Sequence, residues 1–258
     1  MAGIIKTEFK KLKRYFIVWI GIALMLLTVL LTMFTSMADD GMVWNFQVLS
    51  EQVIKNFTTL TFPMCITIIT GYIISRETTD DTLKNIVIVP VSYSKLLFGK
   101  IIVSSILSLF LGMVCFVFTV ATNLVMGYSG LTMQSVFISF GQMGFLALFL
   151  FFAVMPIIVA VNKLRGNFLI GVVLAFVYGF IGMFTGNSLF SSIYPISAAL
   201  GMIHYRSYEV GVYWNTPLCA LSILSMFAIG IAIIFLGGRS NIHEPNMKEK
   251  RVVQKKGW

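Results

Sequence analysis

The sequence has little charge for its length. Of 258 residues, 11% are Asp, Glu, Lys or Arg, whereas 58% are hydrophobic, and the mean hydropathy is +0.91. A soluble domain needs far more polar surface than this to cover itself. The composition therefore excludes an ordinary soluble protein and predicts a chain that spans a membrane.

Residues suited to chemistry are also scarce. Cys65, Cys115 and Cys219 lie within or beside apolar runs, in no metal-like or redox-like spacing. His204 and His243 fall in different predicted compartments. The sequence contains no HExxH, no GxSxG and no paired intramembrane Asp. We therefore expect no catalytic residue, no metal site and no cofactor-binding residue.

A phosphate-binding loop is missing as well. Its pattern, GxxxxGK, must be followed by Ser or Thr, but Gly99-Lys100 is followed by Ile101, and Ser94 stands where the first Gly belongs. The chain is not expected to be an enzyme or to bind ATP by this route. Any ATP-driven function would need a separate ATPase.

What the sequence has in abundance is long apolar runs without charge. A helix needs about 20 such residues to cross a bilayer. The runs predict an all-α membrane protein with one transmembrane domain over residues 1–238 and a basic cytoplasmic tail over residues 239–258. The six predicted spans are residues 16–36, 57–75, 101–123, 137–161, 168–185 and 217–236.

The positive charges predict the orientation. If the N-terminus is inside, all of the 19 Lys and Arg residues except Lys55 and Arg206 fall on inner segments, as the positive-inside rule requires. We therefore expect a multi-pass protein of the cell membrane with both termini in the cytoplasm. This placement explains the net charge of +9 without a nucleic-acid partner.

Two segments outside the spans have an amphipathic pattern. The pattern of residues 4–16 predicts a basic amphipathic helix that anchors on membrane lipid. The alternative is that this segment is only a positive flank that orients the first span. Its proposed anchor residues are Ile5, Phe9, Leu12 and Phe16 on the apolar stripe, with Lys6, Lys10 and Lys13 elsewhere on the helix. In the outer segment 37–55, Val43, Phe46, Leu49 and Val53 could line a second interfacial helix.

The predicted spans contain no Asp, Glu, Lys or Arg. Ion-coupled carriers usually need such a group at membrane depth, so energy must come from elsewhere or the protein is passive. Small residues in the fifth span form a ridge that allows close helix approach, either within the chain or at a subunit interface. They are Gly171, Ala175, Gly179 and Gly182.

The longest polar connection on the inner side is Arg76 to Lys100. Thr78 and Asp81 resemble a capping box at the start of a short helix, which Pro90 would end. Leu83, Ile86 and Val87 fall on one face of that helix. Such a loop either presents an apolar stripe to a partner in water or is an ordinary solvated connection.

This loop resembles the one between spans two and three of ABC-2-type transporter permeases. The resemblance rests on Glu77, Thr82-Leu83-Lys84, Pro90, Ser92, Lys95 and Gly99-Lys100, and on the basic N-terminal helix and six-span plan. Asp81 stands where the family commonly has Gly, and Tyr93 and Ser94 where it often has Arg, which leaves the subfamily open.

The resemblance implies a permease subunit that pairs with a second permease copy or paralogue and with two cytoplasmic ATPase subunits, which would bind ATP and Mg. The loop would then be a coupling helix seated on the ATPase. The implied coupling residues are Glu77, Asp81, Thr82, Leu83, Lys84, Ile86 and Val87.

The short length and hydrophobic make-up resemble the small permeases of antimicrobial-peptide immunity and export systems (lantibiotic and bacitracin). That likeness implies export of an amphipathic peptide or another hydrophobic substrate. Other readings remain open: a membrane scaffold or sensor that recruits a partner through the same loop, a passive channel, and an intramembrane enzyme. The substrate and the identity of the second permease are not determined.

Overall fold

The computed structural model describes residues 2–12, 15–37, 43–79, 93–163, 167–185, 188–206 and 212–236. Within these ranges every regular element is a helix, and the one β-type contact is an isolated bridge between Asn45 and Ser129. The prediction of an all-α fold is therefore confirmed for the described part of the chain.

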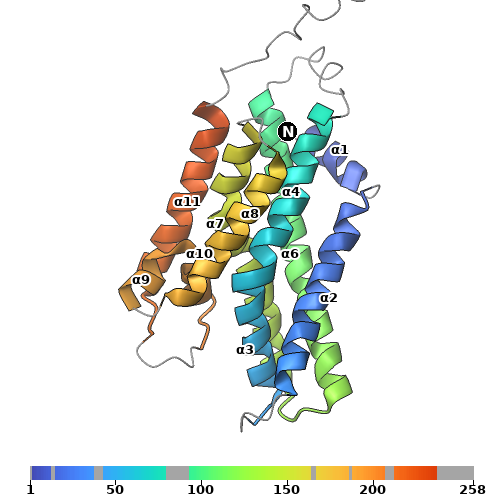
Figure 1. The fold of residues 1–258 in the computed structure, drawn as a ribbon, viewed down its shortest axis with the longest axis vertical. Helices are drawn as coiled ribbons and strands as arrows, with labels where there is room; N and C mark the ends of the chain where they lie inside the picture. The colour runs from blue at the N-terminus through green and yellow to red at the C-terminus, as the bar shows by residue number, and fades with distance from the viewer. Residues whose placement is uncertain are drawn as a thin grey trace, which may run out of the picture.

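Five of the described helices are long and apolar enough to cross a membrane. They run side by side in one bundle (Figure 1), and five of the six predicted spans match one of them. In chain order they are α2 (Ile17–Ser36), the continuous helix of α3 (Phe46–Asn56), η1 (Phe57–Thr61) and α4 (Phe62–Thr79), α6 (Tyr93–Met126), α7 (Met133–Lys163) and α11 (Thr216–Leu236).

The remaining predicted span, the fifth in chain order at residues 168–185, is shorter than the others. It forms α8 (Phe168–Ile181) and the 3₁₀ turn η2 (Gly182–Phe184). A helix over Phe168–Phe184 is about 25 Å long, against a hydrocarbon core of about 30 Å. The helix lies in the bundle against α4 and α7. The structure thus supports five full spans, and a sixth stays a prediction.

The prediction for residues 37–55 is wrong from Phe46 onward. Instead of a separate interfacial helix, α3 continues through the π-helical turn η1 into α4. Phe46, Leu49 and Val53 are fully buried, and α3 packs on α2, α6 and α7. With no Gly or Pro between Phe46 and Phe62, nothing in the sequence breaks the helix, and its apolar stripe packs against helices instead of lipid.

The centre of the bundle is α7, which packs against α4, α6, α8 and α11. Gly112 of α6 allows the closest of these approaches, because a Cβ there would lie 2.5 Å from the Met143 carbonyl oxygen and 2.8 Å from the Ala147 Cβ. The short helices α9 (Ser188–Ile193) and α10 (Pro195–Met202) connect α8 to α11. They pack on α11 at the end far from the N-terminus (Figure 1).

The remaining helix, α1 (Ala2–Leu12), lies across the end of the bundle where α4 ends, α6 begins and α11 ends (Figure 1). We call this the basic end, because most of the described cations gather there. The cations at the basic end are Lys6, Lys10, Lys11, Arg76, Lys95, Lys100 and Lys163. Lys55 and Arg206 belong to the opposite end.

Candidate functional site

The predicted coupling residues lie mostly outside the described residues. Asp81, Thr82, Leu83, Lys84, Ile86 and Val87 fall in the range 80–92, and their assignment stays a prediction. Glu77 lies near the end of α4. The structure does describe the two helices that flank this segment, α4 before it and α6 after it, and both reach the basic end.

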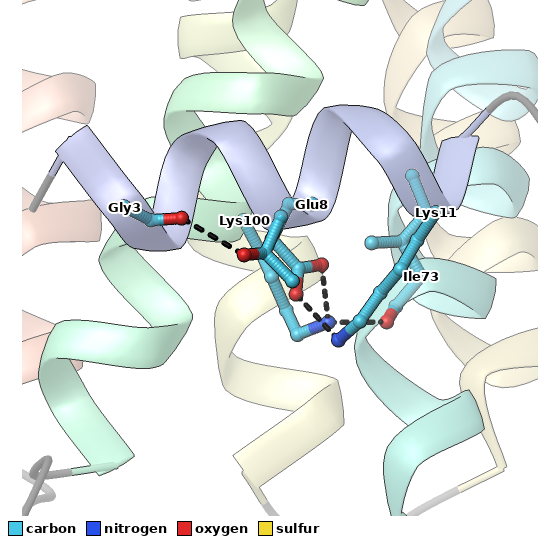
Figure 2. Close-up of polar contacts among 6 residues, drawn as sticks. Gly3, Glu8, Lys11, Ile73 and Lys100 are labelled. Atoms are coloured by element: carbon cyan, nitrogen blue, oxygen red, sulfur yellow. Dashed lines mark hydrogen bonds and ion pairs between the residues drawn. The ribbon is translucent and has the colours of Figure 1, made fainter.

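A buried ion pair joins α1 to this site. The Lys100 ammonium lies 2.8 Å from Glu8 Oε2, and each side chain is only 2% exposed. Lys100 Nζ also donates to the Ile73 carbonyl oxygen of α4 at 3.0 Å. Figure 2 shows Lys100 reaching from α6 to the space between Glu8 and Ile73. One ammonium group thus connects α1, α4 and α6.

The second oxygen of Glu8 is occupied as well. Lys11, one turn further along α1, donates to Glu8 Oε1 at 2.7 Å and is one-third exposed. Burial alone would raise the pKa of the Glu8 carboxyl, but the charges and hydrogen bonds of Lys100 and Lys11 outweigh it, so the pKa lies below its ordinary value. Glu8 is therefore a carboxylate at neutral pH.

A buried ion pair of this kind fixes the position of α1 more than it adds to the stability of the fold. Removing two charges from water costs free energy that their attraction often only balances, whereas deleting one partner leaves an uncompensated charge and costs about 3–5 kcal/mol. The pair is therefore a strong constraint on where α1 sits. It holds only while both partners are present.

The lack of a side chain at Gly99 lets α1 pack close to the start of α6. A Cβ on Gly99 would lie 2.8 Å from Ile4 Cγ2, so a larger residue there would require Ile4 or α1 to shift. Leu12 is buried in the main core cluster, and Ile5 packs against that cluster. The inward face of α1 thus includes Ile4, Ile5, Glu8 and Leu12.

A second contact fixes the corner between α1 and α2. The Arg76 guanidinium carbon lies 4.5 Å from the centre of the Tyr15 ring, at cation–π distance. Arg76 also donates to the Tyr72 hydroxyl at 3.1 Å, and the two tyrosine rings meet edge to face at 5.9 Å. The end of α4 is therefore held to the N-terminal region at two places, Lys100 and Arg76.

The predicted anchor residues divide between two faces of α1 and the following corner. Ile5 and Leu12 point inward, whereas Phe9 is 37% exposed and Phe16 is 76% exposed. Lys6 and Lys10 are exposed, and Lys13 is outside the described residues. Sequence reasoning missed Glu8, although it is the first acidic residue of the chain and stands between Ile4 and Leu12 on the inward face.

The small-residue ridge of α8 and η2 faces the rest of the same chain. A Cβ on Gly179 would lie 2.8 Å from the Thr59 carbonyl oxygen, and one on Gly182 would lie 2.9 Å from Ile196 Cγ2. Gly171 faces Val161 and Thr67, and Ala175 is fully buried. The ridge is therefore occupied by contacts within the chain.

The continuous helix of α3, η1 and α4 bears on the prediction that the spans contain no charged residue. The candidate span Phe46–Arg76 includes Glu51 and Lys55, which the predicted span 57–75 left out. Glu51 is 6% exposed and accepts a hydrogen bond from Gln47. With Arg76 at one membrane surface, Glu51 lies about 37 Å along the helix, beyond a hydrocarbon core of about 30 Å.

An apolar groove lies at the opposite end of the bundle, between α8, α9, α10 and α11. Its volume is about 400 Å³, and aromatic and aliphatic side chains line most of it, among them Tyr178, Phe190, Tyr194, Leu218 and Leu221. In the described residues, no group of three or more His, Cys, Asp or Glu side chains is placed to bind a metal ion.

The comparisons with known proteins now define the class. Residues 4–182 match the family described as ABC-2 family transporter protein. Since this match covers more than half of the chain, the protein belongs to the ABC-2 family of transporter membrane proteins. The matched region includes α1, the segment 80–92 and the start of α6. The resemblance to ABC-2-type permeases is confirmed.

One relative has a named activity. The bacitracin transport permease protein BCRB of Bacillus licheniformis is 28% identical over 131 residues, which are 51% of this chain and 62% of that protein. The aligned part thus spans about three-fifths of the relative's length. The chain is thus similar to part of a bacitracin transport permease. No solved structure matches the chain.

Proposed function

We propose that this chain is the permease subunit of an ATP-binding-cassette exporter, driven by ATP that separate subunits hydrolyse. The observation that carries the proposal is the family match over residues 4–182, which spans the segment between α4 and α6. The sequence contains no phosphate loop, so in this proposal ATP and Mg belong to the partner ATPases. Two such ATPases and a second permease, either a copy or a paralogue, complete the transporter.

In the proposed topology the basic end faces the cytoplasm. The gathering of Lys and Arg at that end supports this orientation. The ends of α1 and α11 lie there together (Figure 1), as a pair of cytoplasmic termini requires. The short helix α8 would be the sixth crossing, and α1 would lie at the inner leaflet with Phe9 and Phe16 toward lipid.

The segment 80–92 is the proposed coupling helix. Leu83, Ile86 and Val87 would seat in a cleft of the ATPase, where burying each side chain contributes roughly 1.5–3 kcal/mol. Glu77, Asp81 and Lys84 would set orientation, because charges at a solvated rim contribute little affinity. Leu83→Asp should release the ATPase subunits or leave them unresponsive, and Lys84→Ala should be much milder.

The proposed substrate is an amphipathic peptide or another hydrophobic molecule. The named activity of the relative, bacitracin transport, supports this class. The apolar groove at the outer end gives such a molecule a surface of matching character.

The test is resistance together with ATP hydrolysis. The permease is expressed together with a candidate partner ATPase in a bacitracin-sensitive host. A parallel strain carries an inactive variant of that ATPase. We expect resistance only with the active ATPase, and bacitracin should stimulate hydrolysis by the purified complex. A complex that assembles but neither protects cells nor responds to hydrophobic peptides would favour a scaffold or sensor over an exporter.

A further inference from the structure

The buried ion pair has a position that its contribution to stability does not explain. Three helices meet at Lys100: α6 supplies the side chain, α1 supplies Glu8, and α4 supplies the Ile73 carbonyl. Ile73 lies six residues before the end of α4, and Lys100 seven residues after the start of α6. The pair therefore sits about two helical turns from each end of the segment 80–92.

The same helix that receives this contact leads directly into the first span. α1 ends at Leu12 and α2 begins at Ile17. Tyr15, in the corner between them, is held by Arg76 near the end of α4. A displacement of the ends of α4 and α6 would therefore act on α1 at Glu8 and on its corner at Tyr15. Both contacts lie on the path from segment 80–92 to α2.

We propose that Glu8 and Lys100 are positioning residues that transmit a displacement of the ends of α4 and α6, which flank segment 80–92, through α1 to α2. The inference rests on the proposed function, in which that segment is where the ATPase binds. Without the ion pair, segment 80–92 could still bind the ATPase, but α1 would no longer follow α4 and α6. The ATPase would remain attached, while α2 would lose its response to nucleotide.

The charges support a link of this kind. Both side chains are almost wholly buried, so water does not screen their attraction. The carboxylate is shared by Lys100 and Lys11, and the ammonium by Glu8 and Ile73. A side chain held in this way has little freedom to move without its partners.

Hydrogen exchange and fluorescence together test the proposal. The first measurement is exchange of the amides of residues 2–12 in the purified permease alone. The second uses the full complex with its ATPase subunits in lipid nanodiscs, with bimane attached to Phe34→Cys in the exposed outer part of α2. Cys65, Cys115 and Cys219 are buried and should not take the label. The readout is the fluorescence change on adding ATP and vanadate.

The main variant is Glu8→Gln, which keeps the shape and removes the charge. We expect exchange of the α1 amides to rise at least ~10-fold as α1 opens from the bundle. ATPase retention should be unchanged, and most of the nucleotide response at position 34 should be lost. Thr7→Ala, on the exposed face of the same helix, should leave all three measurements unchanged.

A double variant separates the pair from the individual residues. Because Glu8→Gln with Lys100→Met leaves no buried charge without a partner, and Lys11 is one-third exposed, its α1 exchange should be lower than in either single variant. Its nucleotide response should still be lost, since the link is absent. If Glu8→Gln gives no monodisperse peak, Glu8→Asp, which keeps the charge on a shorter side chain, should give an intermediate response.

Each contrary outcome has a distinct meaning. Unchanged α1 exchange in Glu8→Gln, or raised exchange with a full response at position 34, overturns the transmission role. A wild-type complex that retains its ATPase but shows no response at position 34 also overturns it. If the wild-type permease retains no ATPase, the proposed function itself fails, and the α1 exchange result still reports whether Glu8 holds α1.

Discussion

Helices α1 and α3 make an instructive pair. Each has 11 residues, each has an apolar stripe and a charged face, and the sequence predicted an interfacial position for both. In the structure α1 is a separate helix across the basic end, whereas α3 is the first part of a long buried helix. The periodicity of apolar residues defines a face, but it does not determine whether lipid or protein covers that face.

Two physical differences separate them. Between α3 and α4 the chain continues in helical conformation through η1, so α3 must follow the direction of α4. Between α1 and α2 the chain turns at Tyr15, so α1 is free to lie across the bundle. What then fixes α1 is a charge in a distant segment, Lys100, which pairs with Glu8.

The largest expected effect follows from the burial of α3. Leu49→Asp places a carboxylate at a fully buried position, which should cost more than about 4 kcal/mol and prevent correct folding. Size-exclusion chromatography in detergent should show loss of the monodisperse peak. Val43→Asp, at a position 82% exposed, is the matched control. A Leu49→Asp protein that still gives a monodisperse peak would indicate that α3 lies at an interface and is not buried.

Next comes the ion pair that holds α1. Lys100→Met should leave Glu8 Oε2 facing an apolar side chain, with Lys11 still paired to Oε1, and destabilise the protein by up to about 3–5 kcal/mol. Thermal unfolding in detergent should show a clearly lower Tm. In the double variant with Glu8→Gln the loss should be smaller than the sum of the two single losses. Additive losses would show that the two charges are not coupled.

A change of pH should act on the same pair with a smaller effect. The pKa of Glu8 is lowered below its ordinary value of 4.5, so its contribution to stability is full above about pH 4.5 and is lost as the pH falls through the lowered folded pKa. The Tm difference between wild type and Glu8→Gln should stay constant from pH 8 to pH 5 and shrink below that. A difference that vanishes near neutral pH would contradict a lowered pKa.

The smallest effect concerns the corner between α1 and α2. Arg76→Gln removes the cation from the Tyr15 ring, an interaction that contributes about 0.5–2 kcal/mol. Exchange of the amides of residues 15–18 should rise, with a shift in Tm smaller than that of Lys100→Met. Arg76→Lys, which keeps a cation, should recover part of the loss. Identical behaviour of the Gln and Lys variants would assign the contact to shape alone.

Most of the fold was open to prediction from the sequence. Five of the six predicted spans correspond to helices of sufficient length, since a helix that satisfies its own backbone hydrogen bonds is the only single-segment structure a bilayer accepts. The second predicted span ended before α4 ends, and the third began after α6 begins. The predicted spans held only charge-free residues, whereas the helices themselves continue beyond the membrane. The predicted bounds 168–185 agree closely with α8 and η2 together, which end at Phe184, so the shortness of this segment was already present in the apolar pattern.

The candidate site was only half visible. The motif residues around Gly99-Lys100 pointed to the family, and the family match agrees. The role of Lys100 inside the protein did not appear, because its partner is 92 positions earlier in the chain. Glu8 did not stand out among the charged residues of the basic N-terminal helix. Nothing in the local pattern of either residue shows that they meet.

The sequence by itself thus determined that this is an α-helical membrane protein of the ABC-2 family, since hydropathy, charge asymmetry and a short motif are local properties. Only the tertiary structure decided that α3 is buried, that the α8 ridge faces its own chain, and that Glu8 and Lys100 form a buried pair. Those facts depend on which segments become neighbours when the helices pack, and contacts between distant segments leave no periodic signal in one sequence.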